Sequence, residues 1–175
     1  MLVVYIILGV AALIGVLAFI APKSFTVERT KIVQVAPEVA FNTLKSLREM
    51  EEWSPWSKKD PNMKVQFHGE DGTVGSYSHW QGNKEVGEGQ HEIKSLKPFS
   101  YIEGELRFLK PWKTTSKGYF HLQKQENNQT EITWGIEGNS QFPFNVMMLF
   151  MNMDKAVGKD FEQGLDSFKS YIENK

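Results

Sequence analysis

The residues of this sequence that are best suited to do chemistry are one histidine and two serines. They lie on neighbouring segments in which apolar and polar residues alternate. If Asn83-Lys84 forms a two-residue turn, antiparallel pairing places Ser76 opposite His91. A histidine beside a serine hydroxyl is the arrangement of a general base and its nucleophile. Such a pair also needs a carboxylate to orient the imidazole and donors to stabilise an oxyanion. The strand pattern puts no carboxylate on the same side, so we favour a buried His91 that hydrogen-bonds Ser76 or Ser78 over a catalytic one.

Composition and motifs exclude several other chemistries. The chain contains no cysteine, which rules out disulfides and thiolate metal sites. It has no H-E-x-x-H motif and no carboxylate cluster, so no metal site is expected. Gly87-Glu88-Gly89 lacks the third glycine and the helix of a dinucleotide-binding loop, and no cofactor is expected. A net charge of -1 argues against nucleic acid as a partner, because nucleic-acid-binding surfaces are basic.

The alternation of side chains around His91 shows which side of these strands faces the interior. Glu88 and Glu92 lie on one side of the stretch and belong in water. The same turn sets Trp80 opposite Gly87, where glycine leaves room for the indole ring. It also sets His79 opposite Glu88 on the outer face, as a solvated cross-strand contact. The inward side therefore contains Gly87, Gly89, His91 and Ile93.

This parity continues through the following strands and predicts an inner wall of apolar side chains interrupted by glycines. The wall suits either a tightly filled core or a lined cavity. A long helix over a curved sheet leaves space, and each glycine removes a side chain that would fill it. We therefore favour a cavity that takes a hydrophobic small molecule or a lipid. The inward positions are Ile102, Gly104, Leu106, Phe108, Gly118, Phe120, Leu122, Ile132, Trp134 and Ile136.

The residues expected to bind such a ligand combine this wall with the helices that cover it. Trp53 and Trp56 either flank the entrance or are structural rings that close the end of the barrel. The predicted ligand-binding set is Trp53, Trp56, Ser76, Ser78, Trp80, His91, Leu106, Phe108, Phe120, Trp134, Met148 and Phe161.

The elements that position these residues are strands in the middle of the chain and helices at its ends. A strand is expected over Phe25 to Val35, followed by a helix from Pro37 to about Ser46. A second short helix carries Leu47 and Met50 and stops near Ser54-Pro55. Alternating segments bounded by turn residues then predict six further strands: Met63 to His68, Gly75 to Gln81, Val86 to Leu96, Ser100 to Leu109, Thr114 to Gln123, and Thr130 to Gly138.

The last segment is an amphipathic helix whose apolar stripe recurs every three or four residues. Its favoured role is core packing against the sheet. Several methionines lie near its start, and because methionine adapts to irregular shapes, that end alternatively borders the cavity. The stripe consists of Phe150, Met153, Val157, Phe161, Leu165, Phe168 and Ile172.

Residues 1 to 21 contain no charged side chain, and roughly 20 apolar residues span a bilayer core of about 30 Å as a helix. A cleaved signal peptide is the alternative. No basic residue precedes the run, however, and cleavage after Ala21 would put the bulky Phe19 three residues before the cut. We therefore expect a single-pass membrane protein with an anchor at 1–21 and a linker at 22–24. Basic residues only follow the span, which favours a cytoplasmic domain: Lys23, Arg29 and Lys31.

Several different short motifs are distributed along the chain between Phe25 and Asn174. They are Ala36-Pro37-Glu38-Val39-Ala40-Phe41, Trp53-Ser54-Pro55-Trp56 with Asp60-Pro61, Gly72 to Gly75, Trp80-Gln81-Gly82-Asn83, Val86-Gly87-Glu88-Gly89, Thr130 to Trp134, and Gly158-Lys159-Asp160-Phe161 with Gly164-Leu165. With the element order, these motifs resemble the SRPBCC superfamily of START, birch-pollen-allergen and polyketide cyclase/dehydrase-like proteins. The similarity is greatest to membrane-anchored bacterial members.

The resemblance implies an α+β helix-grip fold at 25–175, in which a curved antiparallel sheet of about seven strands wraps a long C-terminal helix. It also implies an apolar cavity, but little shared chemistry, because fold does not determine function. Three functions stay open. The first is a membrane-tethered domain that binds a hydrophobic small molecule or lipid. The second is a cyclase- or hydrolase-like enzyme that uses the same cavity, and an inward carboxylate near His91 would favour it. The third is a protein-interaction module with a filled cavity.

Overall fold

The computed structural model describes residues 1–175 and contains one seven-stranded antiparallel sheet with the order β1-β7-β6-β5-β4-β3-β2. Every predicted strand is present, with ends within two residues of the expected positions. The sheet is irregular in β4, where the pairing with β5 shifts at two places, as bulges do in strongly curved sheets. The strands are β1 (Ser24–Val33), β2 (Lys64–His68), β3 (Tyr77–Gln81), β4 (Glu88–Lys97), β5 (Tyr101–Lys110), β6 (Thr114–Lys124) and β7 (Thr130–Asn139).

Three short helices follow β1, where the sequence predicted two. Helix α2 (Pro37–Leu44) has proline at its first position, and the Ser46 hydroxyl accepts a hydrogen bond from Glu49 N at the start of α3 (Leu47–Trp53). Helix α3 ends at Trp53, which confirms the predicted stop near Ser54-Pro55, and a further helix that the sequence did not predict, α4 (Pro55–Lys59), follows directly. Proline again takes the first helical position, and the Ser54 hydroxyl accepts from Trp56 N at 3.3 Å. A cap followed by proline therefore begins a new turn here.

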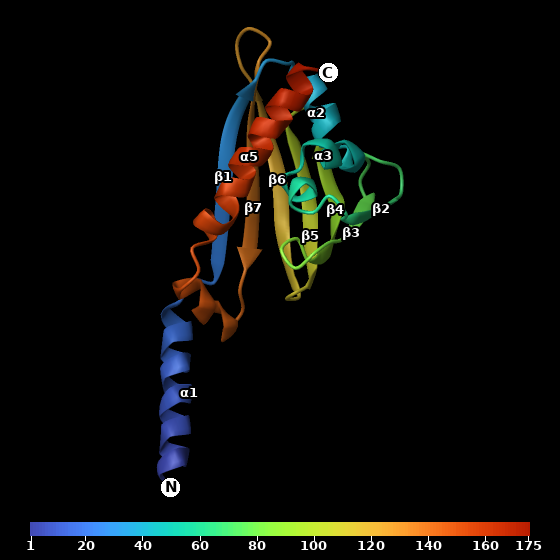
Figure 1. Ribbon diagram of the computed structural model, residues 1–175. Coiled ribbons are helices and arrows are strands. Elements are labelled where there is room, and N and C mark those ends of the chain that lie inside the picture. The colour runs from blue at the N-terminus through green and yellow to red at the C-terminus, as the bar shows by residue number, and fades with distance from the viewer.

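Helix α5 (Met153–Glu173) lies along the inner face of the sheet and makes the helix-grip fold of the α+β class, as predicted (Figure 1). Its apolar stripe packs on the strands in a single core. The Trp134 ring of β7 stacks on the Phe161 ring of α5 with 4.3 Å between centroids. Gly164 permits this close approach, since a Cβ there would lie 2.5 Å from the Trp134 ring. Ion pairs from Arg29 of β1 to Asp154 and Glu162 join the same two layers at 2.7 and 2.6 Å.

The start of α5 differs from the prediction. The helix begins at Met153, where the Asn152 side chain accepts a hydrogen bond from Lys155 N at 2.9 Å. Phe150, expected as the first residue of the buried stripe, lies outside the helix and is 81% exposed. The residues before it form a separate 3-10 turn, η1 (Phe144–Leu149). The periodic pattern predicts Phe150 as part of the buried stripe because the sequence does not distinguish an apolar residue that faces the core from one that faces solvent.

Helix α1 (Leu2–Ile20) projects away from the domain as a single straight rod (Figure 1). It is long and apolar enough to cross a membrane, and nearly all of its side chains are exposed. Its last turn touches the domain at η1. There the buried Asn145 side chain donates from Nδ2 to the carbonyls of Ala18 at 2.7 Å and Ala21 at 3.2 Å.

Candidate functional site

A cavity of about 220 Å³ lies between the inner face of the sheet and the helices that cover it. Seventeen of its 25 lining residues are hydrophobic, which matches the expected apolar wall rather than a filled core. Glycines widen it as predicted: Gly104 and Gly118 line the space, and a Cβ on Gly104 would collide with the His91 ring.

Nine of the twelve predicted ligand-binding residues line this cavity: Trp56, Ser78, Trp80, His91, Leu106, Phe108, Phe120, Trp134 and Phe161. Trp53 is fully buried behind the wall, with edge-to-face contacts to Phe120, Trp134 and Phe168. It is thus a core residue, whereas Trp56, three positions later, borders the cavity. Met148 lies in η1, outside the strands and helices that form the wall, and Ser76 directly precedes the first residue of β3. Neither lines the cavity.

The predicted register between β3 and β4 is wrong by two residues. The structure pairs Ser78 with His91 and Trp80 with Gly89, where the sequence expected Ser76 opposite His91. The connection is longer than a two-residue turn, because the Asn83 side chain accepts hydrogen bonds from the next backbone amides and Gly87 closes the loop with a positive φ of 73°. A shift of two preserves the side that each residue faces, so the inner wall is unchanged.

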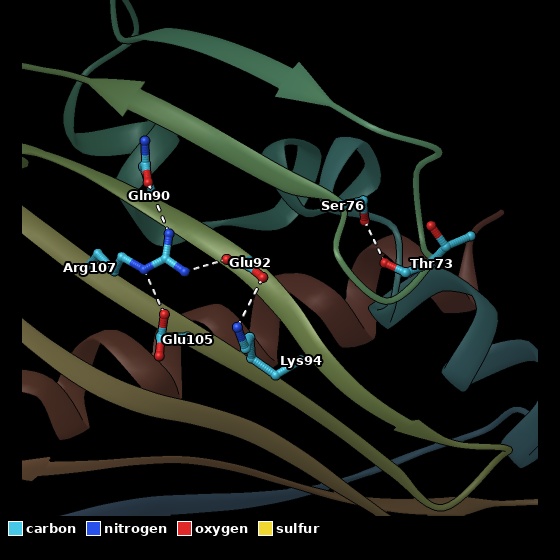
Figure 2. Close-up of polar contacts among 7 residues, drawn as sticks. All are labelled: Thr73, Ser76, Gln90, Glu92, Lys94, Glu105 and Arg107. Carbon is cyan, nitrogen blue, oxygen red and sulfur yellow. Dashed lines mark hydrogen bonds and ion pairs between the residues drawn. The ribbon is translucent and has the colours of Figure 1, made fainter.

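The expected hydrogen bond between Ser76 and His91 is absent. The Ser76 hydroxyl donates instead to the carbonyl of Thr73 at 2.8 Å, in the loop before β3 (Figure 2). His79 is opposite Gln90 rather than Glu88, but its Nε2 still lies 3.5 Å from Glu88 on the outer face. Of Ser76 and Ser78, only Ser78 lines the cavity with the histidine.

His91 is the central polar group of the wall. It is half-buried because its ring faces the empty space, and neither ring nitrogen makes a hydrogen bond within the protein. The apolar surroundings disfavour the charged imidazolium, so burial lowers the pKa of His91 to about 4. A neutral imidazole keeps one donor and one acceptor free for a ligand.

This pKa predicts a pH-dependent stability. Between pH 6.5 and pH 4, the unfolded chain binds a proton at His91 that the folded domain does not. The lowered pKa of His91 therefore adds to the free energy of unfolding. This addition is complete above pH 6.5 and is lost as the pH falls toward 4, and its upper limit is about 3 kcal/mol. Urea unfolding of the detergent-solubilised chain at pH 7 and pH 4.5 measures it. His91→Gln should lack this component, whereas His121→Gln, at an exposed position, should retain it. An identical acid sensitivity in His91→Gln would contradict the assignment.

Two carboxylates that strand parity did not reveal also line the cavity, because they come from the helices. Glu51 of α3 is half-buried and accepts a hydrogen bond from Ser57 Oγ at 2.8 Å, and burial is the main cause that raises its pKa. Asp160 of α5 forms an ion pair with Lys59 at 2.8 Å. Helical spacing assigns Asp160 to the polar face of the last helix, so the sequence carries no signal that it lines the cavity.

The outer face of the sheet has the opposite character. Arg107 pairs with Glu92 and Glu105, and Lys94 also reaches Glu92, in a row across β4 and β5 (Figure 2). These solvated pairs hold the pKa of the Glu92 carboxyl below its usual value, first through Lys94. A wider hollow of about 920 Å³ on this face is lined mainly by polar residues, among them Tyr101, whose hydroxyl donates to Glu103. The enclosed inner cavity is therefore the better site for an apolar ligand.

Solved structures share this fold at low sequence identity. Protein CV1439 from Chromobacterium violaceum is 12% identical, with a TM-score of 0.62 over 85% of this chain and 96% of its own. Ara h 8.0201 is 12% identical, with a TM-score of 0.59 over 87% and 99%. The Aha1 dimer from Colwellia psychrerythraea is 16% identical, with a TM-score of 0.60 over 85% and 96%. Neither a protein-family model nor a curated protein matches the sequence. The likeness concerns the fold alone, and it agrees with the helix-grip architecture expected from the sequence.

Proposed function

We propose that this protein is a membrane-tethered domain that binds a hydrophobic small molecule or a lipid chain in its internal cavity. The observation that carries the proposal is an apolar space of about 220 Å³ in which His91 and Ser78 face each other across the β3–β4 pair without hydrogen-bond partners. Because these polar groups face the cavity and not other polar groups of the protein, a ligand head group in the cavity can pair with them. The apolar lining supplies affinity, and these few polar groups supply orientation.

The volume limits the ligand. Pockets for drug-sized molecules are about 300–1,000 Å³, and this cavity is smaller. Its space corresponds to roughly seven water volumes of about 30 Å³ each. It therefore suits a single medium-length acyl chain or a small ring compound rather than a complete two-chain lipid. A carboxyl or carbonyl head group near His91 would satisfy the free imidazole N–H.

The tether in this proposal is α1. The anchor covers residues 1–21, a short linker covers 22–24 with β1 beginning at its last residue, Ser24, and the binding domain covers 25–175. An exposed, uncharged helix of this length is stable in a bilayer because all of its backbone groups are hydrogen-bonded internally. The basic residues that follow the span support a cytoplasmic position for the domain.

The second candidate is an enzyme acting on an apolar substrate, and Glu51 is the observation that favours it. Burial raises the pKa of this carboxyl, while burial lowers the pKa of His91, and both groups line one cavity. Titratable groups with displaced pKa values in a cleft are characteristic of acid–base catalysis. The two candidates make different predictions for what happens to a bound molecule.

Native mass spectrometry of the full chain released from detergent tests both. We expect a one-to-one adduct with decanoic acid that saturates as the concentration rises, and a competing apolar molecule should displace it. Recovery of decanoic acid or a co-purified ligand with unchanged mass supports a binding protein. A chemically altered product that disappears in both Glu51→Gln and His91→Gln would establish the enzyme instead. A folded protein that forms no saturable adduct would refute both.

A further inference from the structure

A surface of large apolar side chains lies at one end of the domain, and neither the fold nor the cavity uses it. The chain from Gly138 to Met153 carries no charged residue. Within it, six large side chains point into solvent, including Phe144 at 71% and Phe150 at 81% exposure. We call this surface the η1 patch. It consists of Phe142, Phe144, Met147, Leu149, Phe150 and Met151.

The η1 patch is held against the end of α1. Asn145, in the middle of η1, is completely buried and donates hydrogen bonds to the carbonyls of Ala18 and Ala21. Ala18 lies in the last turn of α1 and Ala21 is its C-cap, and the carbonyls at a helix end have no hydrogen-bond partners within the helix. Ser140 N also donates to Lys23 O at 2.9 Å. The patch therefore lies where α1 meets the domain, as Figure 1 shows for the orange turn beside the blue helix.

A second exposed group lies at the same end of the domain. The turn between β5 and β6 carries Trp112, which is 75% exposed, between Lys110 and Lys113. Figure 1 shows this turn pointing toward the end from which α1 projects. Tryptophan is enriched at membrane–water interfaces, and lysine interacts favourably with anionic head groups. Lys110 also pairs with Glu88 at 2.7 Å, so Lys113 is the lysine of this turn without an ion pair.

We propose that the η1 patch inserts into the head-group region of the bilayer that α1 spans, and that Trp112 contacts the same surface. This inference rests on the proposed tether. Soluble domains rarely expose so many large apolar side chains in one uncharged segment. The lipid surface is the occupant because the patch is continuous with α1 through the Asn145 contacts, so any bilayer around α1 begins at these side chains. Burial of the apolar side of a segment in the head-group region is a recognised mode of membrane binding.

This docking would orient the cavity toward the membrane. Phe108 of β5 lines the cavity and lies four residues before Trp112 of the following turn. Val86, in the loop between β3 and β4, also lines the cavity. Both lie at the end of the sheet that carries the β5–β6 turn, because Glu88 at the start of β4 pairs with Lys110 at the end of β5. An opening of the cavity at this end would let an apolar molecule enter from the bilayer without crossing bulk water.

Depth measurement with nitroxide labels tests the inference on the full chain in nanodiscs that contain anionic lipid. The chain has no cysteine, so each introduced cysteine is the only labelling site. Labels at Phe144→Cys, Phe150→Cys and Trp112→Cys should show high accessibility to oxygen and low accessibility to a water-soluble nickel complex. Val39→Cys on α2 is the matched control. It is 49% exposed and lies at the opposite end of the domain, and its label should report water. Leu8→Cys, in the middle of α1, tests the tether itself.

The outcomes separate the two proposals. A lipid signal at Leu8 with water signals at Phe144 and Phe150 would overturn the docking and leave the tether intact. A water signal at Leu8 would refute the tether and the docking together. Labels at Phe144 and Phe150 that exclude both oxygen and nickel would indicate a protein partner and would also overturn the docking. A water signal at Trp112 alone would overturn the orientation of the cavity toward the membrane.

Discussion

Replacing Gly118 with valine is expected to weaken the binding of decanoic acid by roughly 10- to 100-fold, equivalent to about 1.4–3 kcal/mol. Gly118 lies on the inner wall, and a Cβ there would contact only Leu106, at 3.2 Å from Cδ1. The added methyl groups must therefore occupy space that the ligand needs. Folding should change little, since valine is favoured in strands and Leu106 is flexible enough to shift. Titration by native mass spectrometry gives the affinity of each variant.

Lys117→Val is the matched control for this prediction. It places the same side chain on the outer face of the same strand and removes an exposed ion pair with Glu137 and a cation–π contact with the Tyr119 ring, both on that outer face. Its affinity for decanoic acid should equal that of the wild type. Unchanged affinity in Gly118→Val, with its folding confirmed by circular dichroism, would mean that the ligand binds elsewhere.

Replacing Trp134 with alanine is expected to cost about 3–5 kcal/mol of unfolding free energy. The Trp134 ring is nearly fully buried and stacks on Phe161. It also contacts the rings of Trp53, Trp56 and Phe120, with centroids 5.2–5.6 Å away. The cavity already lies beside it, so the removed indole enlarges an empty space that the surrounding structure cannot close. Urea unfolding followed by circular dichroism measures the loss.

Trp112→Ala serves as its control, because the two substitutions remove the same side chain from opposite environments. Trp112 is exposed on a turn, and its removal should change the unfolding free energy of the detergent-solubilised chain by less than about 0.5 kcal/mol. A comparable loss in both variants would show that Trp134 does not hold the sheet and α5 together.

Taken together, the residues of the cavity come from segments that lie far apart in the sequence, and this determines which of them could be foreseen. His91 and Trp134 were placed on the inner wall because each follows the alternation of its own strand. Glu51 was missed because it lies on a short helix, where too few residues establish a face. Trp53 and Trp56 look equivalent in sequence. Only the packing of α3 and α4 against α5 buries Trp53 and leaves Trp56 beside the cavity.

For the pairing of β3 with β4, the sequence predicts the side that each residue faces but not the residue that it pairs with. Alternation has a period of two, so a register error of two residues left every side chain on its predicted side. The partner of His91 changed from Ser76 to Ser78, however, since the number of residues in the loop after β3 depends on how Asn83 caps it and on the left-handed conformation of Gly87. These are properties of the folded loop that alternation does not encode.

The seven strands, the inward side of each, the long C-terminal helix and the apolar N-terminal helix can all be predicted from the sequence. They follow from local periodicity and composition, which act within one segment. The volume of the cavity, the lack of hydrogen-bond partners for His91 and Ser78, and the position of the η1 patch beside α1 depend on how distant segments pack. An apolar residue such as Phe150 is compatible with a core, a cavity or a lipid surface. Which of these it meets depends on segments more than 100 residues away in the chain, such as the Ala18 carbonyl that binds Asn145.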